Sequence, residues 1–127
     1  MPGGRREAVT DARTRPSHRP PAGWSDYRAS IGDRSPLFAA IHAQWGPSTA
    51  LYPGSYLDLS PSTAIASVTY VDVDARAARF FGDSARVAAE LAGRTRAGPA
   101  PQVRFLHADY TQPLPLPVAG FDLLISL

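Results

Sequence analysis

Two short apolar runs, separated by fifteen residues, constrain the fold of this chain more than any other feature. Residues 50–52 (ALY) stop at a Pro-Gly pair, and residues 68–71 (VTYV) stop at Asp72. Neither run alternates between apolar and polar residues, which is typical of parallel strands buried between layers of helices. Parallel neighbours require a right-handed crossover, so their carboxyl ends meet at one edge of the sheet. The sequence therefore predicts Gly54 and Asp72 at the same edge, where open α/β sheets bind small ligands.

The rest of the chain supplies helices and two further strands. Ser35 is expected to cap the first of these helices. The predicted helices are residues 35–45, a segment capped by Asp74, and a segment that begins at Asp83 or Ser84. Residues 102–107 and 121–127 have the composition of a third and a fourth strand. The pattern predicts an α/β fold, in which flanking helices cover a mostly parallel and incomplete sheet of about four strands.

The composition excludes several classes of protein. The chain has 127 residues, one domain at most, and no cysteine, so neither a disulfide framework nor a thiolate metal site can form. The histidines and acids are not spaced as metal ligands, and we predict no metal site. The absence of a long apolar run and of a signal-peptide pattern predicts a cytoplasmic protein without membrane association.

The positive charge is concentrated near the start of the chain. Residues 1–30 hold six arginines against three acids, whereas residues 31–127 hold seven against eight. With almost no large apolar residue before Trp24, this segment cannot bury enough surface to offset its ordering entropy. We predict a disordered Arg/Pro-rich arm over residues 1–30 and a folded domain over residues 31–127. Nucleic acid is disfavoured as a partner, because no aromatic side chain interleaves the arginines before Trp24.

Three predicted strand ends would bring complementary groups to the candidate edge. Gly54 permits a ligand to approach the backbone closely. Asp72 offers two acceptor oxygens to vicinal hydroxyls such as those of a ribose, and Asp109 offers an acceptor for an exocyclic amine. Tyr52 and Val73 could supply apolar walls. A nucleoside along this edge would satisfy all of these groups, while a structural role for each acid is the alternative.

The order of these segments resembles the amino-terminal half of class I S-adenosylmethionine-dependent methyltransferases. ALYPG resembles their first strand and glycine motif, VTYVDVD their second strand, FLHADYTQPLP their third and GFDLLISL their fourth. The resemblance implies a Rossmann-like fold, S-adenosylmethionine as cofactor, and the strand order 3-2-1-4 for these four strands. It also implies that Asp72 binds the ribose and that Asp109 lies beside the adenine. Tyr52, Gly54 and Val73 would complete the cofactor site, while the catalytic residues and the methyl acceptor stay unknown.

Two departures from that family leave alternatives open. Gly54 is followed by Ser55 and Tyr56 instead of further glycines, and the sheet would lack strands that the family has. We therefore expect a truncated methyltransferase-like domain or fragment that is inactive or weakly active alone. The alternative is a non-enzymatic interaction module that pairs with a partner or a second copy through its exposed fourth strand.

Overall fold

A computed structural model describes residues 20–116 and 118–127 of the chain. Within them, four strands form one sheet in the order β3-β2-β1-β4, and every neighbouring pair is parallel. The strands are β1 (Thr49–Pro53), β2 (Ser67–Asp72), β3 (Gln102–His107) and β4 (Leu123–Leu124). The helices are α2 (Trp24–Ile31), α3 (Ser35–Trp45), α4 (Ala75–Phe81) and α5 (Ser84–Leu91). The predicted α/β, Rossmann-like fold with an incomplete parallel sheet is confirmed.

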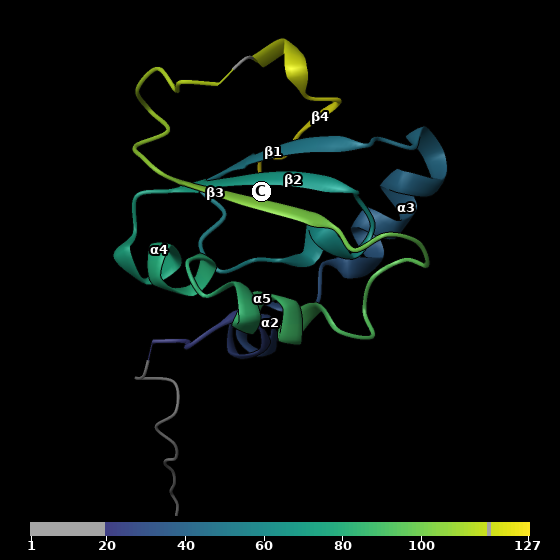
Figure 1. The fold of residues 1–127 in the computed structure, drawn as a ribbon, viewed down its shortest axis with the longest axis horizontal. Coiled ribbons are helices and arrows are strands. Elements are labelled where there is room, and N and C mark those ends of the chain that lie inside the picture. Colours follow the sequence, from purple (N-terminus) through teal and green to yellow (C-terminus); the bar gives the residue numbers. More distant parts are fainter. Residues whose placement is uncertain (1–19, 117) are drawn as a thin grey trace, which may run out of the picture.

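The strand order explains why the helices gather on one face of the sheet. β1, β2 and β3 follow one another in one direction, so right-handed crossovers place the 3₁₀ turn η3 (Ser60–Thr63), α4 and α5 on the same side. β4 lies on the other side of β1, and the connection from β3 to β4 passes over the opposite face (Figure 1). The order thus reverses at β1, which is where open α/β sheets form a crevice beyond the carboxyl ends of their strands.

The core lies between the sheet and these helices. Val68, Tyr70 and Val71 of β2 are fully buried, so both faces of this strand are covered. The ring of Phe81 on α4 has its centre 4.7 Å from that of Tyr70 and stacks at 4.9 Å on that of Phe105 in β3. Aromatic contacts therefore fix α4 against β2 and β3.

Carboxylates accept hydrogen bonds from the first amides of three of the described helices, although not always at the predicted residue. Asp74 and Asp83 each accept a hydrogen bond from a first-turn amide of α4 and α5, at 2.7 and 3.0 Å, as predicted. Helix α3 differs, because Ser35 is its first helical residue and does not cap it. Its N-cap is Arg34, which makes no capping bond with its side chain, and the Ser35 amide instead donates to Asp33 Oδ1 at 2.9 Å.

The fourth strand is shorter than the predicted residues 121–127. Pairing with β1 covers Leu123–Leu124 alone. The strand begins late because Asp122 Oδ2 accepts from the amides of Ser48 and Thr49, at 2.9 and 3.3 Å, and so holds the preceding segment as a turn. It ends at Leu124, opposite Leu51, although β1 continues to Pro53, and the last bond to β1 runs from the Ile125 amide to the Leu51 carbonyl at 2.9 Å.

The predicted boundary of the arm at residue 30 is wrong, because residues from Trp24 onward belong to α2. Trp24 is only 1% exposed, and the guanidinium groups of Arg28 and Arg94 lie 4.4 and 5.7 Å from its ring centre. The side chain of Trp24 thus anchors the start of this helix in the core. Residues 1–19 lie outside the described residues, and disorder there stays a prediction.

We predict that Trp24→Ala lowers the free energy of unfolding by about 3–5 kcal/mol, because it empties a buried aromatic site. Urea unfolding followed by circular dichroism measures the change. Trp45 is the matched control: it is 74% exposed, and Trp45→Ala should shift the stability by less than about 0.5 kcal/mol. Similar small effects of both substitutions would show that α2 is not part of the folded unit.

Candidate functional site

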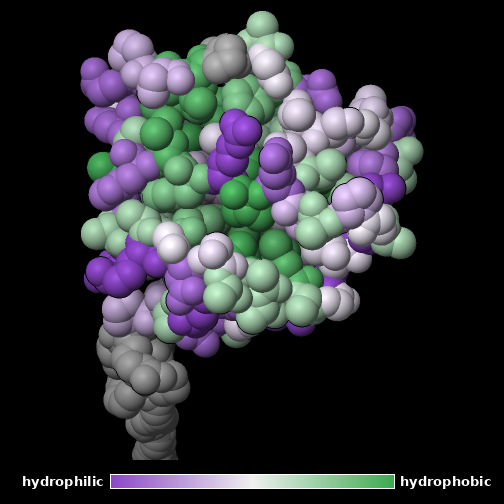
Figure 2. All heavy atoms as spheres, in the orientation of Figure 1, coloured by the Kyte–Doolittle hydropathy of each residue, from purple (hydrophilic) through white to green (hydrophobic). Residues whose placement is uncertain are grey.

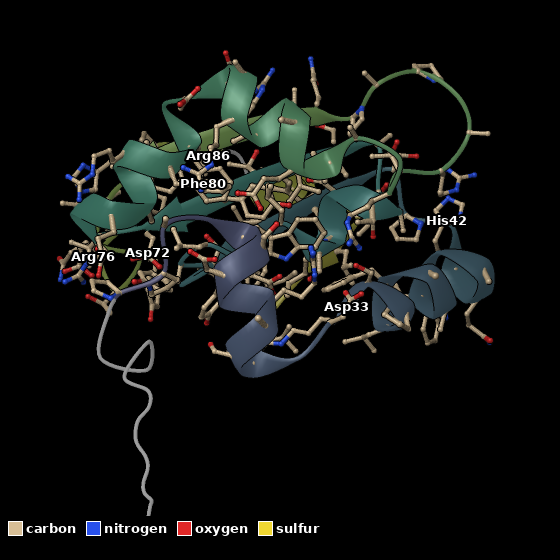
Figure 3. The ribbon with its side chains drawn as sticks, turned by 90° about the horizontal axis from the view of Figure 1, so that it is seen from below. Asp33, His42, Asp72, Arg76, Phe80 and Arg86 are labelled. Atoms are coloured by element: carbon tan, nitrogen blue, oxygen red, sulfur yellow. The ribbon has the colours of Figure 1, made fainter. Side chains whose placement is uncertain are left out.

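The carboxyl ends of β1, β2 and β3 form the candidate site, called here the carboxyl edge. Gly54 follows β1, Asp72 ends β2, and Asp109 lies just beyond β3. Asp72 is aligned with His107 in the pairing of β2 and β3, and its carbonyl accepts from the Ala108 amide at 3.1 Å. The parallel sheet therefore brings the three predicted groups to one edge. In Figure 3 Asp72 lies at the opposite end of the molecule from His42.

Asp72 has the most closely defined surroundings at this edge. It is 8% exposed, and its Oδ2 and Oδ1 accept from the amides of Tyr56 and Asp74, both at 2.8 Å. Tyr56 has a left-handed backbone, with φ 48°, which costs a non-glycine residue about 1–2 kcal/mol. The bond to Asp72 helps to offset that cost. Asp72 thus fixes the loop after β1, and each of its oxygens keeps a further lone pair.

Gly54 shapes the turn after β1. It has φ +70°, and its amide donates to the carbonyl of Val71 at 2.7 Å. A Cβ at this position would lie 3.1 Å from the hydroxyl oxygen of Tyr110. In this structure the group close to Gly54 is the side chain of Tyr110, and the approach of a ligand to this glycine stays a prediction.

Asp109 and Val73 lie on the solvent side of the carboxyl edge. Asp109 Oδ1 accepts from the hydroxyl and the amide of Thr111, at 2.6 and 2.9 Å, and these two bonds lower the pKa of Asp109. Val73 is 61% exposed. A side chain that forms an apolar wall for a ligand has to be accessible in this way. Both residues are thus accessible where the sequence predicted them.

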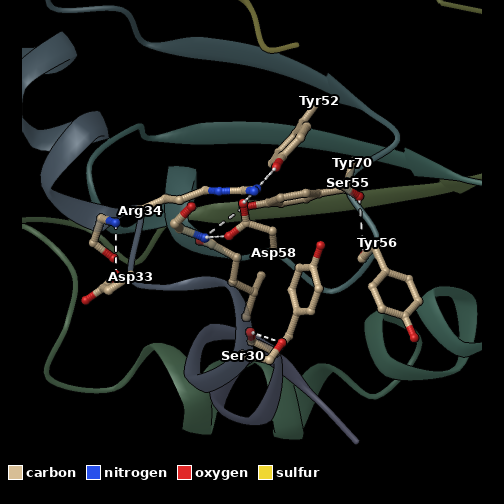
Figure 4. Close-up of polar contacts among 12 residues, drawn as sticks. Ser30, Asp33, Arg34, Tyr52, Ser55, Tyr56, Asp58 and Tyr70 are labelled. Atoms are coloured by element: carbon tan, nitrogen blue, oxygen red, sulfur yellow. Dashed lines mark hydrogen bonds and ion pairs between the residues drawn. The ribbon is translucent and has the colours of Figure 1, made fainter. Parts of the chain in front are cut away.

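The structure corrects the prediction for Tyr52, because its side chain lies in the core and not on the carboxyl edge. It is 2% exposed, its ring centre lies 5.9 Å from that of Tyr70, and its hydroxyl donates to Asp58 Oδ2 at 2.7 Å. Arg34 Nη1 donates to the same carboxylate oxygen and to the Tyr52 hydroxyl, at 3.1 and 3.2 Å (Figure 4). Because a buried polar group requires partners, these bonds hold the Tyr52 ring inside, where it cannot form the wall predicted for it.

Reasoning from the sequence missed Asp58, Arg34 and Tyr27. Asp58 is 1% exposed, and the available signal was its position between two leucines in an apolar run. Tyr27 on α2 packs edge-to-face against Tyr56 with ring centres 5.1 Å apart, and burial raises the pKa of Tyr27. Helix α2 therefore reaches the loop whose amide binds Asp72.

A separate hollow of about 370 Å³ lies between α5 and the start of β3. The walls of this hollow are mostly apolar. Figure 2 shows apolar residues at the surface in the middle of the view. The polar side chains of the hollow are Ser84 and Thr95, and none of the predicted site residues lines it. The residues that line this hollow include no charged side chain.

Comparison with models of known protein families, with curated proteins and with solved structures gave no match. The part of the chain that the structure describes contains no group of histidine and acidic residues that could hold a metal ion. Within the same residues, no helix combines the length and apolarity needed to cross a membrane. A function has to be inferred from the geometry of the carboxyl edge itself.

We predict that the fold loses stability as the pH rises above about 10, because two buried tyrosines must stay neutral. Burial raises the pKa of both Tyr70 and Tyr52 above the ordinary value of 10.0. In the unfolded chain these phenols ionise near pH 10, so their contribution is complete below that pH and is lost as the pH rises toward the folded-state values. The chain contains no lysine, and arginine stays charged, so the transition reports on tyrosine.

The midpoint of urea unfolding, measured from about pH 8 to about pH 11, tests this prediction. Tyr52→Phe should flatten the alkaline decline. Tyr110→Phe, at a half-exposed position, should leave the slope as it is in the wild type. A midpoint that does not change across this range would contradict the expectation.

Proposed function

We propose that this chain contains the nucleoside-binding part of an S-adenosylmethionine-dependent methyltransferase. The observation that carries the proposal is the buried carboxylate of Asp72, fixed by two amides at the end of β2 beside the Gly54 turn. The strand order β3-β2-β1-β4 supports it, because the family that the sequence resembles arranges its first four strands in this way.

The residues at the carboxyl edge suit the nucleoside part of that cofactor. Asp72 has one lone pair left on each oxygen, which suits the two hydroxyls of a ribose, and its amide contacts hold it in place before a ligand arrives. Val73 would face the base, and Asp109 would accept from an exocyclic amine. Gly54 would let the ligand approach the backbone. Tyr52 is no longer part of the proposed set.

When bound, S-adenosylmethionine would supply a methyl group for transfer from its sulfur to a nucleophile. Such a transfer depends mainly on holding the acceptor in line with that sulfur. The described residues supply groups that bind and orient a nucleoside, and we assign no acceptor-binding or catalytic residue among them. We therefore expect weak or no methyl transfer by this chain alone.

S-Adenosylhomocysteine should bind this chain in a calorimetric titration, and Asp72→Asn should weaken binding by about 10- to 100-fold. The reason is that a hydrogen bond to a charged acceptor contributes about 1.5–3 kcal/mol. Asp74→Asn is the matched control, because Asp74 lies at the same edge but caps α4. It should leave the affinity within about twofold.

Nucleosides alone test the contact with the ribose. The wild type should prefer adenosine to 2′-deoxyadenosine, and Asp72→Asn should remove that preference. Equal affinity of the wild type for both nucleosides, or no binding by a chain that circular dichroism shows to be folded, would contradict the proposal.

The exposed fourth strand favours a second candidate function, a module that associates with a second copy. Leu124 and Leu127 are 65% and 64% exposed, and among the described residues the outer edge of β4 has no partner strand. Trp45 and Leu123 line an adjacent hollow of about 500 Å³. An apolar strand edge of this kind is a template for pairing with another strand.

Sedimentation velocity at increasing concentration should detect self-association if this second candidate is correct. Leu124→Lys should abolish it, because a charge on an edge strand opposes pairing. The control is Ile31→Lys, on α2 and away from β4, which should leave it unchanged. A wild-type chain that stays monomeric throughout would exclude this function.

A further inference from the structure

Tyr110 lies across the place where a ligand would approach Gly54. A Cβ added at Gly54 would be 3.1 Å from the hydroxyl oxygen of Tyr110, 3.2 Å from Cζ and 3.3 Å from Cε1. These distances are shorter than most real Cβ contacts, so the ring occupies the space beside Gly54 that a side chain at this position would need. The close approach that a glycine permits is therefore already taken by a side chain of the same protein.

The position of Tyr110 in the chain makes this contact span the carboxyl edge. Tyr110 follows β3 and Gly54 follows β1, and β2 lies between these two strands in the sheet. Asp72 stands at the end of that middle strand. A nucleoside that used both Asp72 and Gly54 would therefore occupy the path along which the side chain of Tyr110 runs.

The backbone beneath Tyr110 is held, whereas its ring borders solvent. Asp109 Oδ1 accepts from the amide and the hydroxyl of Thr111, and the Asp109 carbonyl accepts from the Gln112 amide at 3.1 Å, which closes a turn. Tyr110 itself is 48% exposed. Rotation about its side-chain bonds would carry the ring into solvent and leave the turn intact.

We propose that Tyr110 is an internal competitor for the nucleoside site. Its ring covers Gly54 while the site is empty, and it has to swing away before a nucleoside can contact Gly54 and Asp72 together. This inference rests on the proposed function. The measured association constant is then the intrinsic association constant multiplied by the fraction of molecules in which the ring is already away from Gly54.

Tyr110→Ala and Tyr110→Phe test the competition, with S-adenosylhomocysteine as the probe. Tyr110→Ala removes the ring and should bind about three- to tenfold more tightly than the wild type, with faster association. Tyr110→Phe keeps the ring and should stay within about twofold of the wild type. Calorimetry gives the affinities, and stopped-flow fluorescence gives the association rates.

A second readout needs no ligand. The ring current of an aromatic side chain over Gly54 should shift the Hα resonances of that glycine in the wild type and in Tyr110→Phe, but not in Tyr110→Ala. Saturation with S-adenosylhomocysteine should remove the shift from the wild type. A shift that persists at saturation would overturn the inference, because the ring would then not have moved.

The failures of the two proposals can be distinguished. If the wild type binds the probe and Tyr110→Ala binds it equally or more weakly, the ring does not compete, and the inference fails while the proposed function stands. If none of the three folded proteins binds the probe, the proposed function fails, and the competition fails with it.

Discussion

The parallel pairing of β2 with both β1 and β3 is the constraint on which the rest of the structure depends. β2 is hydrogen-bonded on both edges and buried on both faces. Such a strand can carry a charged side chain only where it leaves the core, and Asp72 stands at that point. Because the neighbouring strands run in the same direction, their ends lie beside Asp72. The carboxyl edge is therefore a consequence of the sheet, and no continuous sequence motif is needed to build it.

Helix α2 joins the start of the folded chain to this edge through a series of contacts. The amide of Ser25 donates to Glu90 Oε1 on α5, and Trp24 is buried beside it. A Cβ at Gly23 would meet the ends of the Glu90 and Arg86 side chains, so these side chains of α5 pack closely against the start of the helix. At the other side of the helix Tyr27 packs on Tyr56, whose amide binds Asp72. Displacing α2 would therefore disturb the loop that holds the Asp72 carboxylate.

The strands and the helix caps could be predicted from the sequence because their causes are local. Residues 102–107 were predicted with the bounds that β3 has, since Val103, Phe105 and Leu106 lie between a Pro/Gly-rich loop and Asp109. The position of Trp24 could not be predicted, because its partner Arg94 is far away in the sequence. The face on which Tyr52 lies could not be predicted either. A run that is apolar on both faces carries no alternation to show which side chains point into the helix layer. The short fourth strand likewise depends on a long-range contact, from Asp122 to Ser48.

The acids of this fold differ in how many of their acceptor sites the protein itself uses. Asp58 accepts from Tyr52, Arg34 and the amide of Ser60, so its burial is compensated within the core and little capacity remains for a ligand. Asp72 is almost as deeply buried, yet it accepts one amide on each oxygen. A buried acceptor gains most from a further donor, because few waters reach it. Of the acids at the carboxyl edge, Asp109 is exposed and its Oδ1 already accepts twice from Thr111, so most of the selectivity for vicinal hydroxyls has to come from Asp72.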